Sequence, residues 1–239
     1  MNKLNQFIAT HRDRFSITDN NIFAFSWSKI TRRLAFLDII EGRYHDASAA
    51  FLANSAAAQR LVKPGTHPVS PEQARLHEEA LPLVADVHLQ IESYYLFAKI
   101  ILDDVARALE YYFGPARGLS LDSHDDLTST LEKYAEHIGL SVSPDLLVSV
   151  ADLKRRISDV RDYKISHEKS PRTMSGTLSG GVGGARIMMT RLYPRKTDPE
   201  QFETEVLPDL RRSIDDYLGS IVDLIEANET KTILKLEGK

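Results

Sequence analysis

The residues of this 239-residue chain best suited to chemistry lie within seven positions, at Arg161, Asp162 and His167. A guanidinium group can hold a phosphate through two parallel hydrogen bonds. A histidine, with an ordinary pKa of about 6.5, can accept and release protons near neutral pH. An arginine and a histidine close together in basic surroundings can therefore bind a phosphodiester and move its protons, which makes RNA a candidate substrate.

A predicted amphipathic helix must position these side chains. Ser143–Asp145 is typical of a helix start, and Ser170–Pro171 of a helix end. The positions that recur at helical spacing are Leu146, Val150, Leu153, Ile157, Val160 and Lys164. At about 100° per residue, Arg161 and His167 lie about 60° to either side of this stripe. Two chains packed antiparallel on the stripe would bring both pairs into one cleft.

The charge around this motif is strongly positive. Residues 153–196 contain eleven Lys or Arg and three acids, a net charge of +8, whereas the rest of the chain carries −12. A basic block on an acidic protein favours a local anion site over general affinity for nucleic acid. The cations that we expect to contact the backbone of RNA are Lys164, Lys169, Arg172, Arg186 and Arg191.

The motif resembles that of the HEPN superfamily, whose members are small helical bundles and often dimers. That motif is an arginine, four to six residues and a histidine, commonly with a polar residue after the arginine. Arg161 matches the arginine, Asp162 the polar residue and His167 the histidine, with five residues between the first and last. The resemblance covers roughly residues 85–170, about a third of the chain.

Many HEPN proteins are metal-independent endoribonucleases, and others only bind RNA or protein partners. The resemblance therefore implies a homodimer with a composite site and no metal or cofactor. It implies more loosely a toxin–antitoxin or phage-defence setting, with an antitoxin or regulatory protein as partner. In such an enzyme the ribose 2′-OH would attack the adjacent phosphate, with His167 as general base or acid and Arg161 as the phosphate clamp. Asp162 would orient Arg161 or select the tautomer of His167.

Two other functions remain open for the same residues. One is a catalytically silent helical module that dimerises or binds a regulator, in which Arg161 and His167 are structural. The other is a sensor that binds a nucleotide or small phosphate in the basic cleft. Two further pairs have similar spacing, Arg60 with His67 and Arg117 with His124, but both span turn-like segments.

Composition indicates an ordinary globular protein. The chain is 42% hydrophobic and 27% charged, and it has no cysteine, which excludes disulfides and a thiol nucleophile. The first residues lack the apolar core of a signal peptide. The most apolar run, residues 94–102, is interrupted by Lys99 and is too short to span a membrane. We expect a cytoplasmic protein with no membrane contact.

The predicted fold is an all-α, multi-helix bundle with an inserted β-hairpin near residues 172–193. We expect a single domain over 1–239, made of four segments. These are an N-terminal helical segment at 1–68, a HEPN-like helical core at 70–170, a Gly-rich β-hairpin at 171–196 and a C-terminal helix at 198–230. The hairpin tip is expected at Ser179–Gly184, where it can lie over the Arg161 and His167 cleft as a lid.

Local signals predict the individual helices. They include a short helix at 2–15, one at 26–43 followed by an alanine-rich stretch, and a long helix to about Phe113 that Pro82 kinks or divides. Asp122–Ser123 is expected to cap a further helix, through about Ile138, and Gly139 to end it. The last helix is expected to start at Asp198–Glu200, with Pro208 inside it. We interpret Asp103 and Asp104 as a solvated helix edge, and the tyrosines at 94, 95, 111 and 112 as core or interface residues.

Overall fold

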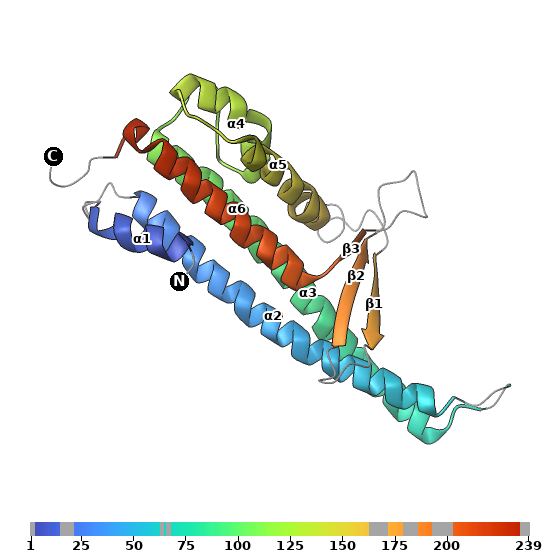
Figure 1. Cartoon of the computed structure of the whole chain (residues 1–239). Helices are drawn as coiled ribbons and strands as arrows, with labels where there is room; N and C mark the ends of the chain where they lie inside the picture. The colour runs from blue at the N-terminus through green and yellow to red at the C-terminus, as the bar shows by residue number, and fades with distance from the viewer. Residues whose placement is uncertain are drawn as a thin grey trace. The chain divides into compact units, whose positions relative to one another are not determined.

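The computed structural model describes residues 3–14, 22–62, 65, 68–162, 172–178, 186–192 and 203–234. The chain divides into two compact units. Unit 1 comprises residues 1–37, 95–162 and 210–239, and unit 2 comprises residues 38–94 and 163–209. The prediction of a mostly helical protein is confirmed (Figure 1).

Unit 1 is a helical bundle. Its elements are α1 (Lys3–Arg14), the first part of α2 (Ile22–Arg60), the second part of α3 (Pro71–Phe113), α4 (His124–Ile138), α5 (Pro144–Leu153), a π-helical turn (Lys154–Ser158), most of α6 (Leu207–Ala227) and a 3₁₀ turn (Glu229–Lys231). Phe7 of α1 packs edge-on against Trp27 of α2, and Phe36 of α2 does the same against Phe97 of α3. Apolar side chains from several helices therefore share one core.

The second part of α3 lies at the centre of unit 1, because it is buried on nearly every side. Its fully buried residues include Tyr95, Ala98, Ile101, Leu102, Val105, Ala108, Leu109 and Tyr112. The prediction that Tyr94, Tyr95 and Tyr112 are core residues is confirmed, while Tyr111 is only partly buried. A helix with so many buried apolar positions is stable in water only when other helices pack against it.

The ends of α4 and α5 follow the predicted capping rules. The Ser123 hydroxyl accepts a hydrogen bond from the amide of Asp126, and Gly139 ends α4 in the left-handed conformation with φ of 78°. The Ser143 hydroxyl accepts from the amide of Leu146, and Pro144 stands in the first turn of α5. These caps hold the short loop between the two helices.

Unit 2 contains the remaining parts of α2 and α3, which form a helical hairpin, and a small sheet. At the start of α3, the amide of Gln73 donates to the Ser70 hydroxyl and the amide of Ser70 donates to the Gln73 side chain, a reciprocal capping box. The Gln73 side chain also donates to the carbonyl of Leu61, which ties the two ends of the connection together.

The sheet has the strand order β1-β2-β3, with β1 at Arg172–Leu178, β2 at Arg186–Leu192 and β3 at Glu203–Glu205. Both pairings are antiparallel. The tip that we predicted at Ser179–Gly184 lies outside the described residues, so the hairpin as one continuous element stays a prediction.

Two predicted boundaries are wrong. The helix expected at 26–43 and the alanine-rich stretch after it form one helix, α2, that runs to Arg60. Of the two effects predicted for Pro82, division of the helix is excluded, because α3 runs through it without a break, and a kink stays a prediction. The last helix does not start at 198–200, since residues 203–205 pair with β2, and Pro208 stands in its first turn.

Candidate functional site

Arg161 and Asp162 follow α5 on a helical segment whose inner face matches the predicted stripe. Leu146, Val150, Leu153, Ile157 and Val160 are all buried. The segment does not keep ideal geometry, however, because residues 154–158 form a π-helical turn. A π turn has more residues per turn than an α-helix. The angles that we derived for Arg161 from an ideal helix therefore do not hold beyond Leu153.

Arg161 and Asp162 contact each other directly. The Nη1 atom of Arg161 donates to Oδ1 of Asp162 at 2.5 Å, and the two side chains are 36% and 33% exposed. The Nε atom of Arg161 is buried and has no hydrogen-bond partner among the described residues. The carboxylate thus holds one edge of the guanidinium group while part of the group stays open to solvent.

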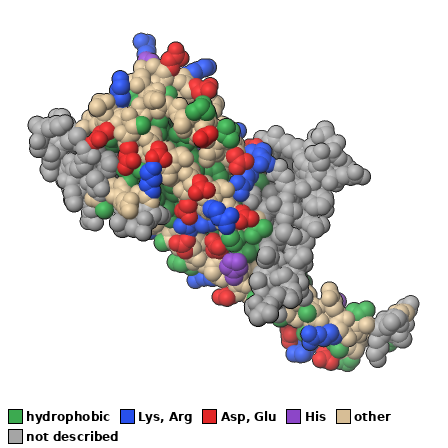
Figure 2. Space-filling view, in the orientation of Figure 1, with side chains coloured by type: hydrophobic (Ala, Val, Ile, Leu, Met, Phe, Trp, Pro, Cys, Tyr) green, Lys and Arg blue, Asp and Glu red, His purple; other side chains and the backbone are tan. Residues whose placement is uncertain are grey.

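The cations that precede Arg161 are neutralised by acids in unit 1. The pairs are Lys154 with Asp125 and Asp159, Arg155 with Asp152, and Arg156 with Asp152 and with the hydroxyl of Ser213. Burial alone would raise the pKa of Asp152, but hydrogen bonds from Arg156 and Arg155 hold it below its ordinary value. On the face shown in Figure 2, Lys and Arg side chains likewise alternate with Asp and Glu. Residues 154–156 of the basic block therefore each have an acid within 4 Å.

None of the other predicted site residues belongs to the described part of unit 1. His167, Lys164 and Lys169 lie outside the described residues. Arg172, Arg186 and Arg191 lie on the strands of unit 2, where Arg172 pairs with Leu192 and Arg186 with Leu178. Six residues of strand separate these two positions, which is roughly 20 Å. Arg172 and Arg186 thus occupy opposite ends of the β1–β2 ladder.

A buried polar cluster in unit 1 was not predicted. Lys99 is 5% exposed, and its Nζ atom contacts Asp103 at 2.9 Å and Asp125 at 3.4 Å. Asp103 also accepts from the backbone amide of His124, whose ring stacks edge-on against Tyr217 with centroids 5.8 Å apart. Burial, reinforced by the charge of Lys99, lowers the pKa of His124 to about 3, so this ring is neutral at pH 7.

Asp104 corrects our interpretation of a solvated helix edge. It is 8% exposed and forms an ion pair with Arg33 of α2. The spacing of Lys99 and Asp103, one helical turn apart in an apolar run, was the available signal for a buried ion pair. The Arg117 and His124 spacing does not form a surface site, because His124 is completely buried.

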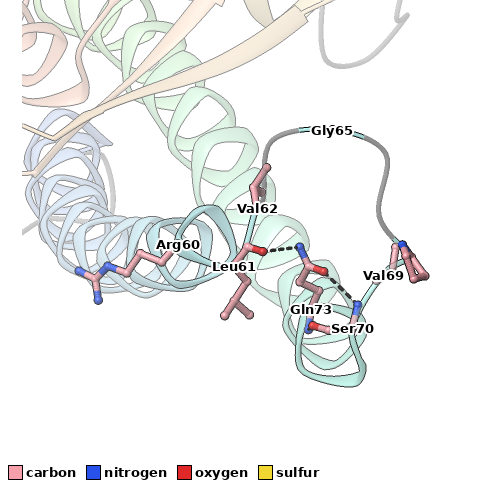
Figure 3. A pocket seen from close by; sticks show the side chains of 8 residues that line it. Arg60, Leu61, Val62, Gly65, Val69, Ser70 and Gln73 are labelled. Carbon is pink, nitrogen blue, oxygen red and sulfur yellow. Dashed lines mark hydrogen bonds between the residues drawn. The ribbon is translucent and has the colours of Figure 1, made fainter.

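The turn of unit 2 contains a shallow hollow lined by Arg60, Leu61, Val62, Gly65, Pro68, Val69, Ser70 and Gln73 (Figure 3). The polar side chains of Ser70 and Gln73 are used by the helix cap and by the contact with Leu61. His67, the spacing partner of Arg60, lies outside the described residues. Of the described residues that line the hollow, Ser70 and Gln73 therefore have their polar groups engaged within the chain.

In the described ranges, no group of three or more His, Asp or Glu side chains is placed to hold a metal ion. No helix among the described residues is long and apolar enough to cross a membrane.

Comparison of the chain with protein-family models, with curated proteins and with solved structures found no match.

Proposed function

We propose that this protein is HEPN-like and acts on RNA as a metal-independent endoribonuclease. The observation that carries the proposal is the Arg161 and Asp162 pair, which holds a partly exposed guanidinium group six residues before His167. A guanidinium group fixed on one edge by a carboxylate loses little conformational freedom when its open edge meets a phosphate.

The proposed reaction exchanges one P–O bond for another. His167 takes the proton of the ribose 2′-OH, the 2′ oxygen attacks the adjacent phosphorus, and the bond to the 5′ oxygen breaks. A protonated histidine gives its proton to the leaving 5′ oxygen, which becomes the 5′-OH. Arg161 offsets the charge that develops on the phosphate oxygens, and Asp162 keeps Arg161 in place. The products are a 2′,3′-cyclic phosphate end and a 5′-OH end.

We also propose that a homodimer completes the site. One chain supplies one arginine and one histidine, and a composite site between two copies would supply both pairs to the phosphate. Lys164, Lys169, Arg172, Arg186 and Arg191 remain the proposed contacts to the RNA backbone. An antitoxin or regulatory protein stays the proposed partner.

The first experiment is cleavage of a mixed-sequence RNA in EDTA by wild type, Arg161→Ala and His167→Ala, with analysis of product ends. We expect wild type to leave cyclic phosphate ends, and each substitution to lower the rate by about 10²-fold or more. His137→Ala is the matched control, because His137 is exposed at the end of α4. Cleavage that persists in His167→Ala, or that requires a divalent metal, would overturn the mechanism.

A second candidate function is favoured by the neutralised cations. Lys154, Arg155 and Arg156 each contact an acid and so offer little net charge to a phosphate backbone. This arrangement suits a catalytically silent helical module that dimerises or binds a regulator. Such a module would form a folded dimer that neither cleaves nor binds RNA, with or without Arg161.

A further inference from the structure

Four cations lie together on α2 and α3 of unit 1, outside the segment that contains Arg161. They are Lys29, Arg32 and Arg33 of α2 and Arg107 of α3, and we call them the α2–α3 basic patch. Lys29, Arg32 and Arg107 are exposed, and the Arg33 side chain is 23% exposed. No motif in the sequence pointed to these residues.

Two contacts fix how the helices bring the patch together. Phe36 packs on Phe97 with ring centroids 5.4 Å apart, and Arg33 forms an ion pair with Asp104. The two helices are therefore antiparallel here. Lys29, one turn before Arg33, and Arg107, one turn after Asp104, lie toward the same end of this contact.

The patch contains more guanidinium groups than carboxylates in contact with them. Asp104 is paired with Arg33, while Lys29 and Arg32 have no ion-pair partner among the described residues. The Nε atom of Arg107 donates to the backbone carbonyl of Asp122 at 2.8 Å, not to its carboxylate.

The nearest further acid on α3, Glu110, accepts from the backbone amide of Leu121. Burial lowers the pKa of Arg33, and the charges of Arg32 and Arg107 lower it further. Arg32 and Arg107 are thus each close enough to Arg33 to repel its guanidinium group.

This arrangement differs from that of residues 154–156. There, each cation has an acid within 4 Å, so the charges satisfy one another. In the α2–α3 basic patch, the Nε atom of Arg107 donates to the carbonyl of Asp122, and its two terminal nitrogens keep their N–H groups available to a ligand. Adjacent arginines with spare planar donors are suited to phosphate oxygens.

We propose that the α2–α3 basic patch binds the phosphodiester backbone of RNA, as a positioning surface separate from the cleavage site. The inference rests on the proposed function for its ligand. Phosphate contacts of this kind set the register of a nucleic acid on a protein without reading its sequence. The patch would hold a stretch of the substrate away from the scissile bond.

The test measures binding of a labelled single-stranded 2′-O-methyl RNA, which lacks the 2′-OH needed for cleavage. Arg32→Gln with Arg107→Gln should lower the affinity about 20-fold at 0.1 M salt, because each lost phosphate contact on a single strand removes about 0.7 from the salt slope. The slope of log K against log salt should fall by about 1.4. Arg32→Gln alone should show about half of that change in slope. Arg32 is exposed and its side chain has no partner among the described residues, so this substitution should leave the fold unchanged.

The matched control is Arg43→Gln with Arg75→Gln. These exposed residues lie on the same two helices, in unit 2, and their substitution removes the same charge. Arg75 is 32 residues before Arg107 along the chain. The control should keep wild-type affinity and salt slope.

The outcomes separate the patch from the proposed function. Wild-type affinity and slope in the Arg32 and Arg107 variant would overturn the patch, while metal-independent cleavage that His167→Ala abolishes would leave the nuclease standing. Weakened RNA binding without any cleavage would support the patch and overturn the nuclease.

A second measurement uses inorganic phosphate at constant ionic strength. If phosphate stabilises wild type but not the variant, and RNA binding is equal in both, the patch binds free phosphate and the RNA proposal is wrong. No binding of RNA by folded wild type would overturn both.

Discussion

His124 is a completely buried histidine at the first position of α4. Neither of its ring nitrogens has a hydrogen-bond partner among the described residues, and the ring rests edge-on against Tyr217. An unpaired buried imidazole is stable only when it is neutral, because charging it without a partner carries a large desolvation cost. The fold therefore keeps the imidazole of His124 neutral at pH 7.

We expect this burial to make unit 1 sensitive to acid. The unfolded chain protonates His124 near pH 6.5, whereas the folded chain does so only near pH 3, so stability falls as the pH drops through this window. Between pH 7 and pH 5, wild type should lose about 2 kcal/mol of unfolding free energy relative to His124→Leu. Urea unfolding at both pH values measures the difference. Exposed His137→Leu is the control, and an equal loss in all three proteins would contradict the role of His124.

At the scale of elements, the caps around α4 explain where this helix begins and ends. The Ser123 hydroxyl accepts from the amide of Asp126 at 3.1 Å and also donates to its carboxylate at 2.7 Å. At the other end, the amide of Gly139 donates to the carbonyl of Ala135. The N-cap holds the start of the helix, where Asp125 contacts the buried Lys99 and the amide of His124 donates to Asp103.

Ser123→Ala should lower the free energy of unfolding by about 1 kcal/mol, because it leaves the Asp126 amide without its cap. Ser129→Ala is the control on the same helix, since the Ser129 hydroxyl only donates to a backbone carbonyl at an exposed position. Thermal unfolding of the two variants should separate them. Equal stability of the two variants would show that water satisfies the Asp126 amide as well as the Ser123 hydroxyl does.

At the scale of the molecule, the end of the chain ties α6 to the α4–α5 loop within unit 1. The Asn228 side chain accepts from the amide of Ser141 at 2.8 Å and donates to the carbonyls of Ser141 and Leu224. Beyond it, Thr232 and Ile233 both donate to the carbonyl of Tyr112 near the end of α3. Side chains distant in sequence therefore satisfy backbone groups that the helix ends leave unpaired.

Asn228→Ala should destabilise unit 1 by about 2 to 3 kcal/mol, because Asn228 is buried and its removal leaves the backbone groups of Ser141 unpaired. The neighbouring Thr230 is exposed, and Thr230→Ala should change stability by less than about 0.5 kcal/mol. Chemical denaturation with a helical signal compares the two. A loss below 1 kcal/mol in Asn228→Ala would mean that water replaces these contacts.

Much of the local structure was predictable, and the candidate site was predictable only in part. The stripe from Leu146 to Val160 and the caps of α4 and α5 depend on neighbours within one or two turns, so periodicity and residue type are enough to find them. The boundaries of α2 and α6 were missed because burial in the core and pairing with β2 override weak local signals. The π turn at 154–158 was missed because no local sequence pattern predicts it.

The sequence by itself determined the helical class of the protein, the inner face of the Arg161 helix and the adjacency of Arg161 and Asp162. Tertiary structure decided which charges remain open to a ligand. Lys154 is neutralised in part by Asp125 of α4, and Arg33 by Asp104 of α3, while Lys29 and Arg32 have no ion-pair partner among the described residues. A charge interacts through space with whatever packing brings within a few ångströms, so a count of charges along the chain cannot reveal its partner.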